Sequence, residues 1–117
     1  MITGFDHVAI ISSSERSVEF YSRLGFKEIL RKKRELDTIV ILEGYGCQIE
    51  MFIDANHPAR ETDPESLGLR HFALSVDDID KIANEFDCGP INKDWFGRRY
   101  CFTTDSDGLK VEFVEIG

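Results

Sequence analysis

Residues 69–76, Leu-Arg-His-Phe-Ala-Leu-Ser-Val, repeat the pattern of residues 5–11, Phe-Asp-His-Val-Ala-Ile-Ile. In both segments a histidine precedes an apolar run of strand length, and a residue that can cap a helix follows the run. The chain therefore contains two copies of one unit, and this repeat decides the fold.

Each copy continues with one helix and three further strands. In the first copy, apolar spacing predicts a helix over 14–24, with serines 12–14 available for its N-cap and Gly25 closing it. Strands are expected at 26–34, 38–43 and 47–53. In the second copy, Asp77 is expected to cap a helix, and Asp105 to Gly108 form a tight turn between strands at 98–104 and 109–116. The element order βαβββ, linker, βαβββ predicts an α+β fold.

Length and composition predict one globular domain, 1–117, with module 1 at 1–53, a polar linker at 54–69 and module 2 at 70–117. A net charge of −8 disfavours nucleic acid and anionic membranes as partners. No apolar run has the length of a membrane span, and no secretory signal is visible. Three cysteines without CxxC spacing fit a reducing compartment. We therefore expect a cytoplasmic protein.

Four polar residues recur at matching places: His7 with His71, and Glu50 with Glu112. Strand alternation puts all four on the face away from the helix, and a small alanine follows each histidine by two residues. A carboxylate removed from water needs a partner, and imidazole with carboxylate suits Ni, Co, Zn, Fe or Mn. Singly, each histidine can be structural and each glutamate can face water. Together, their symmetry predicts a divalent metal site.

The sequence resembles the vicinal oxygen chelate superfamily, which includes glyoxalase I, extradiol dioxygenases, methylmalonyl-CoA epimerase, and fosfomycin and bleomycin resistance proteins. It is most similar to short bacterial glyoxalase I-like (lactoylglutathione lyase-like) proteins. The resemblance covers nearly the whole chain. Ser106 stands where the family's usual turn has proline. The segments that carry the resemblance are 5–9, 20–26, 49–52, 68–78 and 105–113.

This resemblance implies an open, cupped sheet with helices on its outer face and one divalent ion bound by His7, Glu50, His71 and Glu112. Ni or Co is favoured, and Zn, Mn or Fe is possible. The implied activity is that of a lyase or isomerase that transfers a proton next to a carbonyl through a metal-chelated enediolate, for example on a 2-oxoaldehyde–thiol hemithioacetal. Glu112 is the expected base and Glu50 its counterpart. An acyl-CoA epimerase, an extradiol-type dioxygenase and a metal-free binding or resistance module stay open as alternatives.

Substrate contacts are expected on the same face. Either Arg98 or Arg99 should point toward it, to pair with a substrate anion or to remain solvated. Aromatic residues either line the pocket or pack in the core: Phe52, Trp95, Phe96, Tyr100 and Phe102. The resemblance also implies a homodimer, in which each site is built within one chain or across two. The expected binding partner is a small-molecule substrate.

Overall fold

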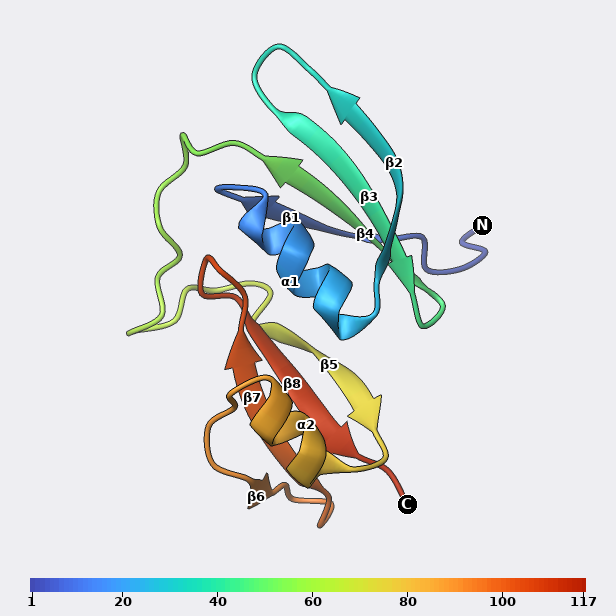
Figure 1. Ribbon diagram of the computed structural model, residues 1–117, viewed down its shortest axis with the longest axis vertical. Coiled ribbons are helices and arrows are strands. Elements are labelled where there is room, and N and C mark those ends of the chain that lie inside the picture. Colours follow the sequence, from blue (N-terminus) through green and yellow to red (C-terminus); the bar gives the residue numbers. More distant parts are fainter. The chain divides into compact units, whose positions relative to one another are not determined.

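The computed structural model describes residues 1–117 and forms two compact units, Met1–Ala59 and Arg60–Gly117. Each unit holds one four-stranded sheet with one helix on one of its faces (Figure 1). Both sheets mix parallel and antiparallel pairs, and neither closes into a barrel. The α+β class and the βαβββ order are confirmed.

The first unit has the strand order β1-β4-β3-β2, in which β1 is parallel to β4 and the other pairs are antiparallel. In the middle of β3 and β4 alternate side chains are buried, Val40 and Leu42 in β3 and Ile49 and Met51 in β4. Val18, Tyr21 and Leu24 of the helix are buried as well. This alternation builds the core on the helix side and leaves the other face of the sheet open. The elements are β1 (Val8–Ser12), α1 (Arg16–Leu24), β2 (Lys27–Lys33), β3 (Thr38–Gly44) and β4 (Cys47–Ile53).

The second unit repeats this arrangement with the order β5-β8-β7-β6, and β5 is parallel to β8. The expected turn forms as Asp105 Oδ1 accepts hydrogen bonds from the backbone N–H groups of Asp107 and Leu109. The irregular stretch before β7 contains one very short strand. The elements are β5 (His71–Val76), α2 (Ile79–Glu85), β6 (Asn92–Lys93), β7 (Arg99–Thr104) and β8 (Lys110–Glu115).

The helix ends follow the sequence in part. Gly25 ends α1 with a φ of 112° and is the predicted left-handed cap. Glu15 occupies the N-cap position of α1 but makes no side-chain capping hydrogen bond, and Ser14 Oγ accepts from the N–H of Arg16 at 3.3 Å. The expected cap at Asp77 is wrong by one residue: Asp78 has the extended backbone of a cap and accepts from the N–H of Lys81. Neither helix is long and apolar enough to cross a membrane.

Candidate metal centre

The face of each sheet opposite its helix carries the residues singled out by the repeat. In the first unit, Ile49 and Met51 of β4 are buried on the helix side, and Glu50 between them points the other way. The parallel ladders place Ala9 opposite Glu50 and Ala73 opposite Glu112. The two units therefore present each glutamate in the same register beside a small side chain.

His7 and Glu50 form the first pair. His7 lies directly before β1, and its Nε2 atom is 3.0 Å from Oε2 of Glu50. Its other ring nitrogen, Nδ1, is 2.7 Å from Oδ2 of Asp6. The hydrogen bond to Asp6 raises the pKa of His7 above its ordinary value, and the charges of Glu50 and Asp6 raise it further, against a smaller opposing effect of burial. A proton held on Nδ1 by Asp6 leaves Nε2 available as a ligand atom.

His71 and Glu112 form the second pair. His71 begins β5, and its Nε2 atom is 3.4 Å from Oε1 of Glu112 on β8. The ring of Phe102 packs edge-on against the imidazole, with the centroids 5.0 Å apart. Nδ1 of His71 is buried and has no hydrogen-bond partner, and the residue before His71 is Arg70, which pairs with Glu65 instead. The two histidines thus differ in what holds the ring.

The donor types suit a transition metal. Each unit contributes one imidazole nitrogen and one carboxylate, which are ligands for Ni, Co, Zn, Fe and Mn. Within either unit, no group of three or more His, Cys, Asp or Glu side chains converges as a metal site. Each pair by itself therefore offers one imidazole nitrogen and one carboxylate, which is fewer than the three or four protein ligands of a typical transition-metal site.

The predicted substrate residues divide between the two faces. Tyr100 and Phe102 alternate with buried Cys101 on β7, and Phe102 lies opposite Glu112 in the ladder. Phe52 lies opposite Ile39 and Ile11, two residues beyond Glu50 on the same face. These three aromatic residues therefore share the face of the His–Glu pairs.

Neither predicted arginine is free on that face. Arg99 lies on the helix side of β7, where it binds Asp80 of α2 at 2.8 Å and Glu115 at 3.4 Å. Arg98 binds Asp94 at 3.1 Å and stacks over Phe96. Trp95 and Phe96 are 91% and 72% exposed, so they are not core residues.

Sequence reasoning missed two residues beside the first pair. Asp6 could have been identified from the sequence because it immediately precedes the candidate ligand His7. Arg34 in the β2–β3 turn lies over the Phe52 ring at 5.5 Å and is close enough to Glu50 for their charges to interact. Its signal is the basic run Arg31-Lys32-Lys33-Arg34, which is unusual in a chain of net charge −8.

Comparison with known proteins identifies the family of the chain. Residues 4–113 match the family model described as Glyoxalase/Bleomycin resistance protein/Dioxygenase superfamily. The uncharacterized protein YwkD of Bacillus subtilis (strain 168) is 34% identical over 126 aligned positions, covering 98% of each chain.

Solved structures share the fold. The glyoxalase family protein of Enterococcus faecalis is 33% identical with a TM-score of 0.86, covering 96% of this chain and 97% of that one. A variant of the fosfomycin resistance protein FosX of Listeria monocytogenes, complexed with Mn(II) and 1S,2S-dihydroxypropylphosphonic acid, has a TM-score of 0.75 at 17% identity. The match to this FosX variant covers 97% of the present chain and 93% of the FosX chain. The chain thus belongs to the glyoxalase/bleomycin resistance/dioxygenase (vicinal oxygen chelate) superfamily.

Proposed function

We propose that this protein is a metal-dependent lyase or isomerase of the glyoxalase I type, which transfers a proton next to a carbonyl of a small-molecule substrate. One observation carries the proposal: a His–Glu pair occurs in the same register of both sheets, His7 with Glu50 and His71 with Glu112. A purely structural role for one pair would not require its repetition in the other unit.

The four side chains hold one divalent ion in this proposal, whether one chain or two chains supply the pairs. Two carboxylates balance its charge, and Ni or Co is the favoured metal, as the resemblance to short glyoxalases implies. When bound, such an ion supplies a Lewis acid for two neighbouring substrate oxygens. Superfamily members bind divalent metal, as the Mn(II) complex of FosX illustrates.

Glu112 is the proposed general base. Its side chain is 18% exposed and that of Glu50 is 28% exposed, so Glu112 is the more sheltered carboxylate. Phe102 lies opposite it in the antiparallel ladder, where we expect the ring to shield one side of the carboxylate from water. Glu112 removes the proton from the carbon next to the carbonyl and returns it to the neighbouring carbon, while Glu50 faces the substrate from the other pair.

The remaining parts of the proposal concern the setting of the enzyme. All three cysteines are unpaired, which supports a reducing cytoplasm. A homodimer is proposed because each sheet ends in edge strands, β1 and β2 in the first and β5 and β6 in the second, which pairing can cover.

Turnover of a labelled substrate tests this function. The Ni-loaded protein is mixed with two classes of candidate substrate. The first consists of the hemithioacetals that methylglyoxal, labelled with deuterium at its aldehyde carbon, forms with glutathione and with other thiols. The second consists of 2-methyl acyl-CoA thioesters. We expect metal-dependent product formation from one of these classes, slowed several-fold by deuterium because a C–H bond breaks. Absence of turnover and of C–H exchange across the panel would contradict the proposal. Oxygen uptake with catechols would favour a dioxygenase.

A further inference from the structure

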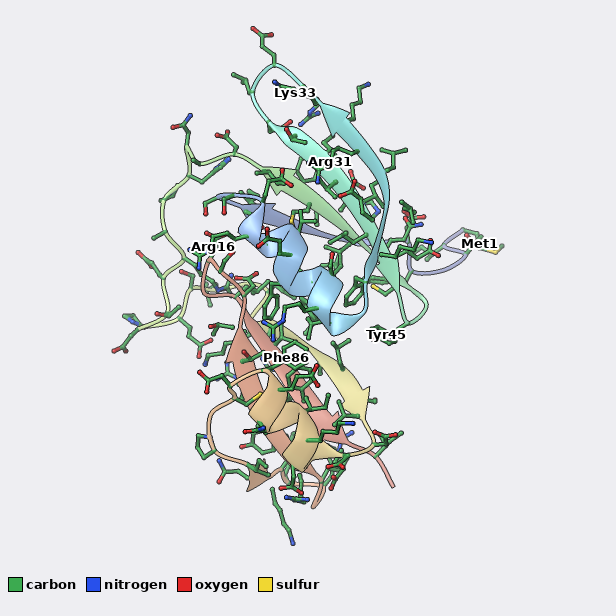
Figure 2. All side chains as sticks on the ribbon, in the orientation of Figure 1. Met1, Arg16, Arg31, Lys33, Tyr45 and Phe86 are labelled. Atoms are coloured by element: carbon green, nitrogen blue, oxygen red, sulfur yellow. The ribbon has the colours of Figure 1, made fainter.

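Arg34 is fixed in place by the hairpin that carries it. It follows Lys33, the last residue of β2, which Figure 2 labels at the end of that strand. Its backbone N–H donates to the carbonyl of Asp37 at 2.7 Å, and its Nε and Nη2 atoms each bind one carboxylate oxygen of Asp37 at 2.7 Å. Asp37 is only 15% exposed, so the guanidinium has a rigid anchor on one edge.

The same guanidinium lies close to residues of the candidate site. Its central carbon lies 5.5 Å from the centre of the Phe52 ring. Phe52 and Glu50 are two residues apart on β4 and so project on the same side, about 7 Å apart. The carboxylate of Glu50 adds to the effects that hold the pKa of Arg34 above its ordinary value, the first of which is the hydrogen bond to Asp37. The cation is therefore within one small molecule's length of the His7–Glu50 pair.

Asp37 does not exhaust the donors of Arg34. A guanidinium has five N–H donors, and the two bonds to Asp37 use one at Nε and one at Nη2. Nη1 makes no bond to Asp37, and the side chain remains 48% exposed. A stacked arginine with free donors is well suited to bind a planar carboxylate or a phosphate-type oxyanion.

We propose that Arg34 determines specificity, by binding an oxyanion group (carboxylate, phosphate or phosphonate) of the substrate whose other oxygens meet the metal held by His7, Glu50, His71 and Glu112. This inference rests on the proposed function, because it assumes that metal. The inference adds a substrate class to the proposed function: molecules that carry a negative charge near their chelating oxygens. The alternative is that Arg34 only closes the hairpin through Asp37.

Three hydroxamates provide the test, since all chelate a metal in the same way. Acetohydroxamate has no further charge, succinic monohydroxamic acid adds a carboxylate, and phosphonoacetohydroxamate adds a phosphonate. Isothermal titration of the Ni-loaded protein measures the affinity for each. We expect at least one charged probe to bind about ten-fold or more tightly than acetohydroxamate, in keeping with a charge-assisted hydrogen bond, and the preferred probe identifies the oxyanion.

Substitutions of Arg34 test whether this residue causes the preference for the charged hydroxamates. In Arg34→Gln, and in Arg34→Met, which retains alkyl packing on Phe52, the preference should fall to within about two-fold while acetohydroxamate binds as before. Arg31→Gln is the matched control. This variant also loses one positive charge, but Arg31 (labelled in Figure 2) lies opposite buried Val40 in the β2–β3 ladder and binds Glu15 and Glu28. That variant should keep the preference.

The outcomes separate the two proposals. If acetohydroxamate binds and wild type shows no preference, or if the preference survives in both Arg34 variants, the role of Arg34 is wrong and the metal centre stands. If Arg31→Gln abolishes the preference equally, the effect is one of net charge and the role of Arg34 is again wrong. If acetohydroxamate does not bind the metal-treated wild type, the proposed metal centre fails and this inference fails with it.

Discussion

Nε2 of His71 lies 3.4 Å from Oε1 of Glu112, and both side chains project from neighbouring parallel strands, β5 and β8. The first unit repeats the relationship between His7 and Glu50 at 3.0 Å. The two pairs differ around the histidine ring: Asp6 binds Nδ1 of His7, and nothing binds Nδ1 of His71. The two candidate ligand rings thus differ in the contacts that hold them, and the prediction for Asp6 below makes use of this difference.

Replacing Glu112 by Gln should abolish most of the turnover. The amide keeps the shape and can still reach a metal, but it cannot accept a proton from carbon, so we expect turnover to fall by about 10²- to 10⁴-fold. Steady-state kinetics with whichever substrate of the proposed panel is turned over measure this, and elemental analysis checks that metal is retained. Glu50→Gln is the matched variant, with a smaller expected loss of turnover. Full activity in Glu112→Gln would exclude this residue as the base.

Removing the carboxylate of Asp6 should weaken metal binding without unfolding the protein. Asp6 fixes the ring of His7 through Nδ1, and loss of such support typically costs 10- to 100-fold in metal affinity. We expect about a ten-fold loss in Asp6→Asn, measured by competition with a chromogenic chelator. Arg70→Ala alters the corresponding position before His71, where the side chain binds Glu65, and should change the affinity less. Equal effects in both variants would argue against a positioning role for Asp6.

Gly25→Ala should destabilise the first unit more than Gly46→Ala. Both glycines have positive φ, 112° and 75°, so both substitutions strain the backbone. Only at Gly25 would the added methyl group collide with a neighbour, the hydroxyl of Tyr45, which donates to the carbonyl of Leu24 (Tyr45 is labelled in Figure 2). We expect Gly46→Ala to cost about 1 kcal/mol and Gly25→Ala about 1–2 kcal/mol more. Urea titration gives both values, and equal losses would show that the collision is relieved at no cost.

Cys88 should resist thiol reagents in the folded protein. Burial, followed by its hydrogen bond to the neighbouring Cys101 thiol, raises the pKa of Cys88 to about 12. Only the thiolate reacts, so at pH 8 about one molecule in 10⁴ is reactive, and the rate should rise about ten-fold per pH unit up to that pKa. Because the folded-state pKa is the higher one, this thiol stabilises the fold below about pH 9, and the stabilisation declines as pH rises toward 12. Iodoacetamide labelling followed by peptide mass spectrometry tests this, and rapid native labelling at pH 8 would contradict it.

Much of the fold follows from local patterns that the sequence states directly. The alternation around Glu50 and the spacing of Val18, Tyr21 and Leu24 identified the buried faces, and Gly25 identified the end of α1. The second cap was placed on Asp77 rather than Asp78 because both residues can cap. The choice depends on which backbone is extended, and tertiary packing sets that.

The site was predictable only as far as the repeat extends. Symmetry identified the two His–Glu pairs, and strand parity put Phe52 and Phe102 on the correct face. Strand alternation does not predict which residues pair with the arginines. Arg99, for example, binds Asp80 of α2 on the helix side of the sheet. Arg34 was missed because its position depends on how a hairpin folds back, which no periodicity encodes.

The central claim is that both His–Glu pairs bind one and the same divalent ion, and metal titration of single-ligand variants tests it most directly. Protein freed of metal is titrated with Ni²⁺ by calorimetry, as wild type, as His7→Ala and as His71→Ala, and stoichiometry is checked by elemental analysis. We predict one ion per pair of units in wild type and a loss of affinity of at least about 100-fold in either variant, since each removes a ligand of the same ion. Tight binding that survives in one of these variants, or the absence of stoichiometric metal in wild type, would contradict the account.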